Sequence, residues 1–313
     1  MHGAFLGVLV VLLGLLGLAG TASASSTTRQ AAVRGGAHQV PGYHGTTVQL
    51  AKSHLAKKRP AISNTVRPNA VSGHTVSYGP ITAQAHSQWT AWVNCPSGTL
   101  AAGGGESNTS PGGISLHDSY ALSGGGGWQV AVTNDSAAQS TFTVYGVCLS
   151  GLTSYGQVLR EAPVPANSTG TVGAYCSGKQ EVLGGGGSVT VLNTRVQDDG
   201  YSLTFDQPYL GAWRFIVHNF DAVSRDATAQ VLCGVGITTS GVVDSDQVAP
   251  GQLQTASESC SSGTTVLSGG GGSGGQSGIR ITDSYPDGNG WRMYVMNDDT
   301  QPGSITTGVH CGF

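Results

Sequence analysis

The stretch that decides the fold is residues 95–148, CPSGTLAAGGGESNTSPGGISLHDSYALSGGGGWQVAVTNDSAAQSTFTVYGVC. It begins and ends with cysteine. Between the cysteines it carries a glycine triplet, an Asp-x-Tyr motif, and a tryptophan followed by alternating apolar residues and an asparagine. The same order of landmarks returns in residues 176–233 and 260–311. Self-similarity of this kind indicates three copies of one structural unit.

The spacing of these landmarks is constant in the three copies. Counted from the first cysteine, the triplet lies at +8 to +10 (Ser-Gly-Gly in the third copy) and the aspartate at +23. The asparagine follows the tryptophan by six residues and precedes the closing cysteine by 14. Only the segment between Asp-x-Tyr and tryptophan varies in length, as 121–127, 202–212 and 286–290. From residue 74 the chain therefore divides into units of about 80 residues: unit 1 (74–151), unit 2 (152–237) and unit 3 (238–313).

The local patterns predict an all-β protein. Each tryptophan starts a run of period two, Trp-x-apolar-x-Val-x-Asn, which is typical of a half-buried strand. A second alternating run precedes the closing cysteine in units 1 and 3, and Asn, Asp, Ser and Gly between the two runs indicate hairpin turns. With 50 glycines in 313 residues and only 10% charged residues, helical bundles are excluded. We expect about five short strands per unit, with the units arranged about a pseudo-threefold axis, as in a β-prism, or as tandem modules.

The six cysteines predict one disulfide in each unit. Six cysteines allow 15 pairings. Because every unit has one opening and one closing cysteine, the most economical set is Cys95–Cys148, Cys176–Cys233 and Cys260–Cys311. Disulfides persist in oxidising compartments. No Cys or His spacing is typical of a zinc site, so we expect no metal and no catalytic thiol.

The N-terminus predicts export. Residues 4–19 are apolar, and Ala22-Ser23-Ala24 is a small-residue cleavage site, so residues 1–24 are expected to be a signal peptide. Once they are removed, the protein is expected to be secreted and not bound to a membrane.

A basic arm separates the signal peptide from the first unit. Residues 25–73 contain no acidic residue, three prolines and few aromatic residues, whereas 74–313 contain all 17 acidic residues of the chain. Such a segment buries too little apolar surface to offset its ordering entropy, so we expect it to be disordered. It is a cleaved propeptide, a spacer, or an arm that docks on an acidic surface, its own body included. The basic residues of this arm are Arg29, Arg34, Lys52, Lys57, Lys58, Arg59 and Arg67.

The glycine triplets have a packing explanation. Glycine in a strand usually marks a bulge or the close approach of another backbone. Because the triplet has a fixed offset from the cysteine, we expect the three triplets to meet near a common axis, in preference to three flexible loops.

The Asp-x-Tyr motifs are the candidate ligand-binding residues. A carboxylate beside an aromatic ring suits a saccharide, whose hydroxyls need acceptors and whose ring face is apolar. The structural alternative is that the aspartates bond backbone N–H groups and the tyrosines fill the core. The residues are Asp118, Tyr120, Asp199, Tyr201, Asp283 and Tyr285.

No motif in the sequence predicts catalysis, so we do not expect an enzyme. Ser273 lies in a formal G-x-S-x-G, but the residues after it predict a strand where a nucleophile elbow needs a helix. The same tract formally meets G-x-G-x-x-G without the βαβ context that nucleotide binding needs. We expect no cofactor, and the acidic body disfavours nucleic acid as a partner.

The repeated pattern C-x-x-G, GGG, D-x-Y, W-x-Φ-x-V-x-N, C in residues 74–313 resembles that of secreted actinobacterial proteins with cysteine-bounded, glycine-triplet repeats. The three-unit β body is also similar in architecture to β-prism lectins. Neither likeness implies a named activity. The absence of a catalytic motif, beside three equivalent candidate sites, predicts a secreted, non-catalytic binding protein that recognises an extracellular glycan or protein surface. The alternatives are an adaptor subunit of a larger secreted assembly, held through residues 25–73, and a hydrolase using Ser273.

Overall fold

A computed structural model describes residues 34–39, 71–189, 194–202, 211–276 and 278–313, with only the backbone of 194–202 considered. All of them belong to one compact unit of the chain, 33–313. This part of the chain is built from antiparallel strands and one 3-10 turn, Ser123–Gly125, with no α-helix. The all-β prediction is therefore confirmed. The predicted signal peptide 1–24 lies outside the described residues.

Each unit has six strands, one more than the sequence predicts, because the residues before its first cysteine form two strands. Unit 1 contains β2 (Ser72–Ala83), β3 (Ser87–Asn94), β4 (Leu100–Asn108), β5 (Ile114–Ala121), β6 (Gly127–Asn134) and β7 (Ser140–Ser150). Unit 2 contains β8 (Ser154–Val164), β9 (Ser168–Tyr175), β10 (Glu181–Val189), β11 (Thr194–Ser202), β12 (Ala212–Asn219) and β13 (Arg225–Val235). Unit 3 contains β14 (Thr239–Val248), β15 (Leu253–Ser259), β16 (Thr265–Gly272), β17 (Ile279–Asp287), β18 (Gly290–Asn297) and β19 (Gly303–Gly312).

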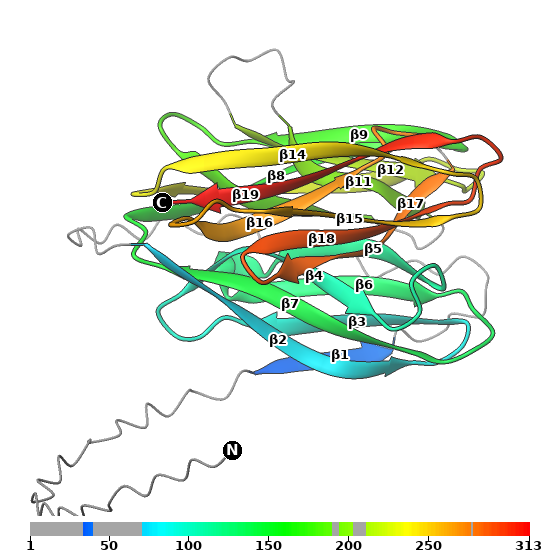
Figure 1. Ribbon diagram of the computed structural model, residues 1–313, viewed down its shortest axis with the longest axis horizontal. Helices are drawn as coiled ribbons and strands as arrows, with labels where there is room; N and C mark the ends of the chain where they lie inside the picture. Colours follow the sequence, from blue (N-terminus) through cyan, green and yellow to red (C-terminus); the bar gives the residue numbers. More distant parts are fainter. Residues whose placement is uncertain (1–33, 40–70, 190–193, 203–210, 277) are drawn as a thin grey trace, which may run out of the picture. The chain divides into compact units, whose positions relative to one another are not determined.

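Every sheet is shared between two units (Figure 1). Sheet I has the order β1-β3-β6-β5-β10-β13-β8, sheet II the order β14-β19-β16-β11-β12-β9, and sheet III the order β15-β18-β17-β4-β7-β2. In each sheet the strand with the Asp-x-Tyr motif pairs with the glycine-rich strand of another unit. We name these contacts junction 1/2 (β5–β10), junction 2/3 (β11–β16) and junction 3/1 (β17–β4).

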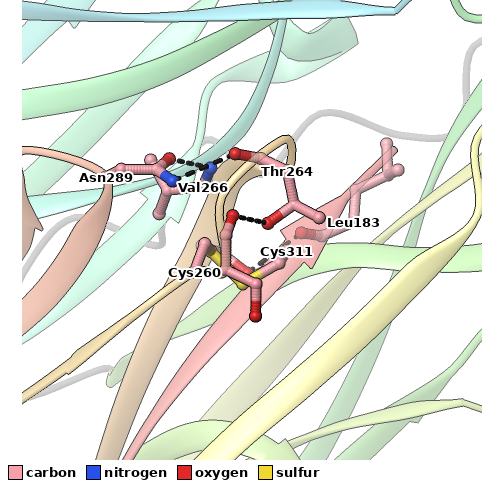
Figure 2. The surroundings of a disulfide bond; sticks show 8 residues. Leu183, Cys260, Thr264, Val266, Asn289 and Cys311 are labelled. Atoms are coloured by element: carbon pink, nitrogen blue, oxygen red, sulfur yellow. Dashed lines mark hydrogen bonds between the residues drawn. A yellow bond between two sulfur atoms is a disulfide. The ribbon is translucent and has the colours of Figure 1, made fainter.

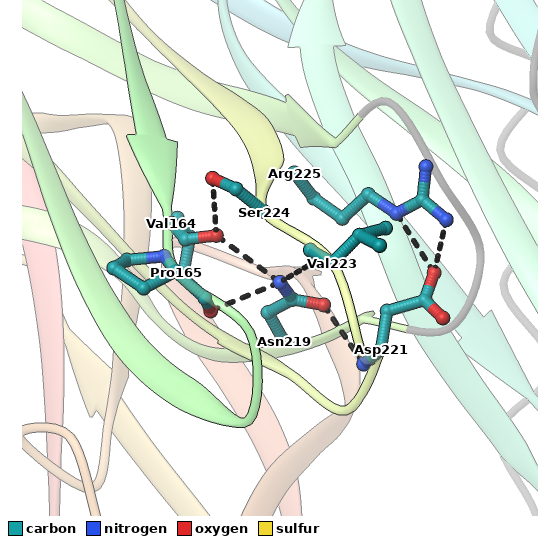
Figure 3. A network of polar contacts seen from close by, with 7 residues as sticks. All are labelled: Val164, Pro165, Asn219, Asp221, Val223, Ser224 and Arg225. Carbon is teal, nitrogen blue, oxygen red and sulfur yellow. Dashed lines mark hydrogen bonds and ion pairs between the residues drawn. The ribbon is translucent and has the colours of Figure 1, made fainter.

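The tryptophans and asparagines of the repeat stabilise the interior. Trp128, Trp213 and Trp291 are each 1% exposed and each is the second residue of its strand, in β6, β12 and β18. The buried asparagine at the end of that strand closes the next turn (Figure 3): Asn219 Nδ2 donates to the carbonyls of Val164, Pro165 and Val223, and its Oδ1 accepts from the Asp221 N–H. Asn134 and Asn297 make corresponding bonds. A buried amide that satisfies several backbone groups is costly to replace.

The three disulfides have the predicted pairing, Cys95–Cys148, Cys176–Cys233 and Cys260–Cys311. In every unit the first cysteine directly follows a strand of one sheet (β3, β9 or β15), and the second lies in a strand of another sheet (β7, β13 or β19). Figure 2 shows the third bond, with Leu183 of unit 2 drawn beside it. Each disulfide therefore ties two sheets together within one unit, and all three indicate an oxidising environment.

One part of the basic arm is ordered. Residues Gly35–Gln39 form β1, which extends sheet I by pairing antiparallel with β3. The expectation of a wholly disordered arm is wrong for these residues, because the outer edge of β3 offers unpaired backbone groups that a strand can satisfy. The carbonyl of Arg34 accepts from the Asn94 N–H at 2.6 Å. The other basic arm residues lie outside the described part.

Candidate functional site

The glycine triplets lie where the three units contact one another. A Cβ on Gly103 would meet the carbonyl oxygen of Leu267 and the side chain of Ser268. A Cβ on Gly184 would meet Ser268 and the carbonyl oxygen of Ala102, and Ser268 Oγ donates to the Leu183 carbonyl at 2.9 Å. The first triplet positions of units 1, 2 and 3 are thus in mutual contact. This close packing agrees with the packing explanation of the triplets.

The second and third triplet positions have different neighbours. The second faces the tryptophan of its own unit, because a Cβ on Gly104, Gly185 or Gly269 would overlap the indole of Trp128, Trp213 or Trp291. The third faces another unit: a Cβ on Gly105 would overlap the carbonyl oxygen of Ser284, and one on Gly186 that of Ser119. Both carbonyls belong to the central residue of an Asp-x-Tyr motif. The triplet and this motif are therefore two halves of one contact.

The aspartates of units 1 and 3 are buried in the junctions. Asp118 Oδ1 accepts from the Val189 N–H of unit 2 at 3.0 Å, and Asp283 Oδ1 accepts from the Asn108 N–H of unit 1. Burial raises the pKa of Asp118 to about 7 and that of Asp283 to about 7, since desolvation disfavours the charged carboxylate. These contacts favour the structural alternative for both residues. Ligand binding by them stays a prediction, and the side chain of Asp199 lies outside the described residues.

The tyrosines of the motif also make contacts within the protein. The Tyr120 hydroxyl accepts from Gln129 Nε2, and only 7% of Tyr120 is exposed. Tyr285 is half-buried and stacks on Tyr145 of unit 1, with ring centroids 5.5 Å apart. The side chain of Tyr201 lies outside the described residues. Tyr285 therefore helps to close junction 3/1, whereas the Tyr120 contact lies within unit 1.

A further buried carboxylate was not predicted. Glu106 lies at the end of the glycine-rich segment of β4, where units 2 and 3 have Gly187 and Gly271. It is fully buried and paired in register with Ser284, next to Asp283. Burial first, and then the neighbouring Asp283, raise the pKa of Glu106 well above its usual range. The signal in the sequence is a lone acidic residue at a position that is glycine in both other copies.

The position three residues before each closing cysteine decides whether a junction is filled. In unit 1 it is Tyr145, which stacks on Tyr285 at junction 3/1. In unit 2 it is Gln230, which donates to the Ala121 carbonyl and accepts from the Ala121 N–H at junction 1/2. In unit 3 it is Gly308, which has no side chain to place there. This position is not among the predicted site residues, although it differs in all three copies of the repeat.

A cavity of about 110 Å³ lies beside Gly308 at junction 2/3. Among the described residues, its lining includes glycine backbone, a guanidinium, a hydroxyl, an exposed apolar side chain and two buried rings: Gly270, Gly272, Gly308, Arg214, Thr306, Val243, Trp213 and His310. Val243 is 56% exposed. An apolar wall with a few polar groups is what a small-ligand site requires. This cavity is the candidate functional site.

The strand next to the cavity differs in register from its counterparts. Tyr120 of β5 pairs with Gln129, and Tyr285 of β17 pairs with Arg292, in both cases the residue after the tryptophan. In β11, Tyr201 pairs with Trp213 itself, because the whole strand is offset by one residue: Thr194 pairs with Asn219, one repeat position earlier than the residues that pair with the equivalent asparagines in the other units. A shift by one residue exchanges the faces of a strand. The backbone of junction 2/3 is thus arranged differently from that of the other two.

The described residues contain no cluster of three or more His, Cys, Asp and Glu side chains that could hold a metal ion. Ser273 Oγ bonds the backbone of Gln276 in a turn that leads into β17, as the sequence predicts, and not into a helix. Among these residues there is also no helix of the length and hydrophobicity that crossing a bilayer requires.

No family model matches the sequence, and no curated protein matches it significantly.

Proposed function

We propose that this protein is a secreted, non-catalytic binding protein whose ligand is an extracellular glycan or protein surface. The cavity beside Gly308 is the observation that carries the proposal. Its glycine lining leaves backbone groups within reach of a ligand, and Val243 supplies an apolar contact. The Arg214 guanidinium and the Thr306 hydroxyl, which also contacts Ser245 Oγ at 3.2 Å, add polar groups to the same wall. The volume suits one sugar ring edge or one side chain, with the rest of the ligand lying over β14.

The proposal includes a pseudo-threefold, β-prism-like arrangement of the units. It is supported by the cyclic order of the junctions and by the mutual contact of Gly103, Gly184 and Ser268. In such an arrangement the three junctions are equivalent positions, and only junction 2/3 has lost the side chain that fills the others. The ligand site is therefore single, not threefold as the repeated Asp-x-Tyr motifs suggest.

Glycan-array and pull-down binding of the secreted protein test this function. Gly308→Tyr places at junction 2/3 the side chain that unit 1 has at the same position, and we expect it to abolish binding. The matched control is Ser304→Tyr, at an exposed residue of the same strand that does not line the cavity. Equal binding by wild type and Gly308→Tyr, with both folded, would overturn the cavity as the site. A triple variant, Asp118→Asn, Asp199→Asn, Asp283→Asn, tests the other site. If it folds but does not bind, the aspartates of the Asp-x-Tyr motifs bind the ligand.

The second candidate function is an adaptor subunit of a larger secreted assembly. The observation that favours it is β1, since an arm that adds a strand to a sheet edge can do so within one chain or between chains. Size-exclusion chromatography of the culture supernatant separates the two candidates. Co-elution with a larger chain supports the adaptor, and a monomer that binds glycan supports the first proposal.

A further inference from the structure

The contact between β1 and β3 is a complete strand pair. Five residues are in register, from Gly35 opposite Val93 to Gln39 opposite Trp89, and the Arg34 carbonyl adds a bond to the Asn94 N–H. Backbone hydrogen bonds of this kind give the same affinity whether the two strands belong to one chain or to two chains.

The side chains make the contact specific. A Cβ on Gly36 would overlap the indole of Trp92, and a Cβ on Gly35 would overlap the ring of Tyr78. His38 lies beside the same indole, with ring centroids 6.0 Å apart. The Gly-Gly pair of the arm therefore fits between two aromatic rings, with Trp92 against one face of β1 and Tyr78 against the other.

The corresponding edges of the other units lack these aromatic rings. β9 and β15 hold the places of β3 in units 2 and 3, and each is the last strand of its sheet in the described part of the chain. The residues equivalent to Trp92, three positions before the first cysteine of the unit, are Gly173 in unit 2 and Ser257 in unit 3. The arm sequence is thus complementary to one edge only, that of β3.

The segment between β1 and β2 has enough residues for the arm to reach either its own body or the body of a second copy. Thirty-two residues, 40–71, separate β1 from β2, enough to span roughly 100 Å when extended. The arm has only basic charges, while the body carries all 17 acidic residues, so the attraction acts on any copy of the body.

We propose that the outer edge of β3 is a strand-acceptor site that binds residues 34–39 of a second copy of this chain in exchange with its own. The contacts in the exchanged form are those already described, so exchange costs only the effective concentration that joining both strands in one chain provides. Exchange therefore grows with protein concentration and dominates where an acceptor's own arm cannot dock. The inference is independent of the cavity and of its ligand.

Disulfide trapping between full-length secreted chains tests the exchange. His38 and Thr90 are direct partners in the β1–β3 ladder. One chain carries His38→Cys as the donor, and the other carries Thr90→Cys together with Gly36→Val, which prevents the acceptor's own arm from fitting against Trp92. In a glutathione buffer we expect an intermolecular disulfide, at least about fivefold more abundant than with an acceptor that retains Gly36.

Two controls make each outcome decisive. A donor with Ala37→Cys places its thiol on the opposite face of β1 and should give no more than background dimer. A single chain with His38→Cys and Thr90→Cys should form the bond within a monomer. If that single chain forms the bond but the mixed chains give only background dimer, exchange between copies is excluded. If the single chain also fails to form it, the acceptor site itself is wrong.

Discussion

Junctions 1/2 and 2/3 are built from the same repeat motifs, but a side chain fills the first and a cavity remains at the second. At junction 1/2 Gln230 spans the boundary and bonds both backbone groups of Ala121, and Asp118 bonds the Val189 N–H. At junction 2/3 the residue equivalent to Gln230 is Gly308, and a cavity remains. The comparison teaches that the repeated landmarks hold the units together, whereas the residue three positions before the closing cysteine differs between the junction that is filled and the junction that keeps a cavity.

The largest expected effect is at the third glycine of the triplet. Gly186→Val places a side chain on the Ser119 carbonyl oxygen at junction 1/2, so the two strands cannot pair. We expect a loss of at least ~4 kcal/mol and little or no secreted protein. Secreted yield and thermal unfolding measure this.

The matched control for Gly186 is Gly308→Val at junction 2/3. A Cβ there would make ordinary contacts, 3.5 Å from the Val242 carbonyl oxygen, so this variant should lie within about 1 kcal/mol of wild type. Normal secretion and stability of Gly186→Val would contradict the close approach of the two units.

Gln230→Ala should leave a cavity at junction 1/2, and we expect it to cause the next largest loss of stability. It leaves the Ala121 N–H and carbonyl, both buried, without their partner, for a loss of about 2–4 kcal/mol in denaturant unfolding. Gln157→Ala is the control, since Gln157 bonds Gly124 and Leu122 at the more exposed end of the same junction and should cost about 1 kcal/mol or less. Equal losses for the two variants would mean that burial at the junction is unimportant.

The buried carboxylates make stability depend on pH. Folded Asp118 has a pKa of about 7 and an ordinary aspartate 3.8. Between these values the folded state keeps a proton that the unfolded state releases, so the contribution of Asp118 to stability is greatest in acid and falls as the pH rises from 4 to 7. Buried His310, whose pKa is lowered to about 4 by desolvation, acts in the opposite sense and offsets part of this fall. We expect the free energy of unfolding at pH 8 to be up to a few kcal/mol lower than at pH 5.

Asp118→Asn keeps an acceptor for the Val189 N–H and removes the titration. Its stability should fall less steeply over the same pH range, with a remaining slope from Asp283 and Glu106 at junction 3/1. Urea unfolding at several pH values measures both slopes. An unchanged slope in the variant would show that Asp118 is ionised in the folded state throughout.

Much of the fold follows from the sequence because its signals are local. The period-two runs, the turn residues and the paired cysteines predict the strands and the disulfides. The sequence does not show that Asp-x-Tyr of one unit faces the glycine triplet of another, because both motifs read equally well as parts of a single unit. For the same reason Asp118 and Asp283 were candidates for an exposed site although they are buried. The β1 strand was missed because its five residues lack alternation, and their order comes from Trp92 and Tyr78, which lie far along the chain.

The smallest expected effect comes from Gly308→Gln, which gives junction 2/3 the residue that closes junction 1/2. Because β11 is offset by one residue relative to β5, the new amide should not find the backbone pair that Gln230 finds, and we expect stability to change by less than about 1 kcal/mol. Thermal unfolding beside Gly308→Ala isolates the contribution of the amide. A gain of several kcal/mol would mean that junction 2/3 closes in the same way as junction 1/2. In that case the offset and the cavity would not persist in solution, and the ligand site would have to be sought elsewhere on the body.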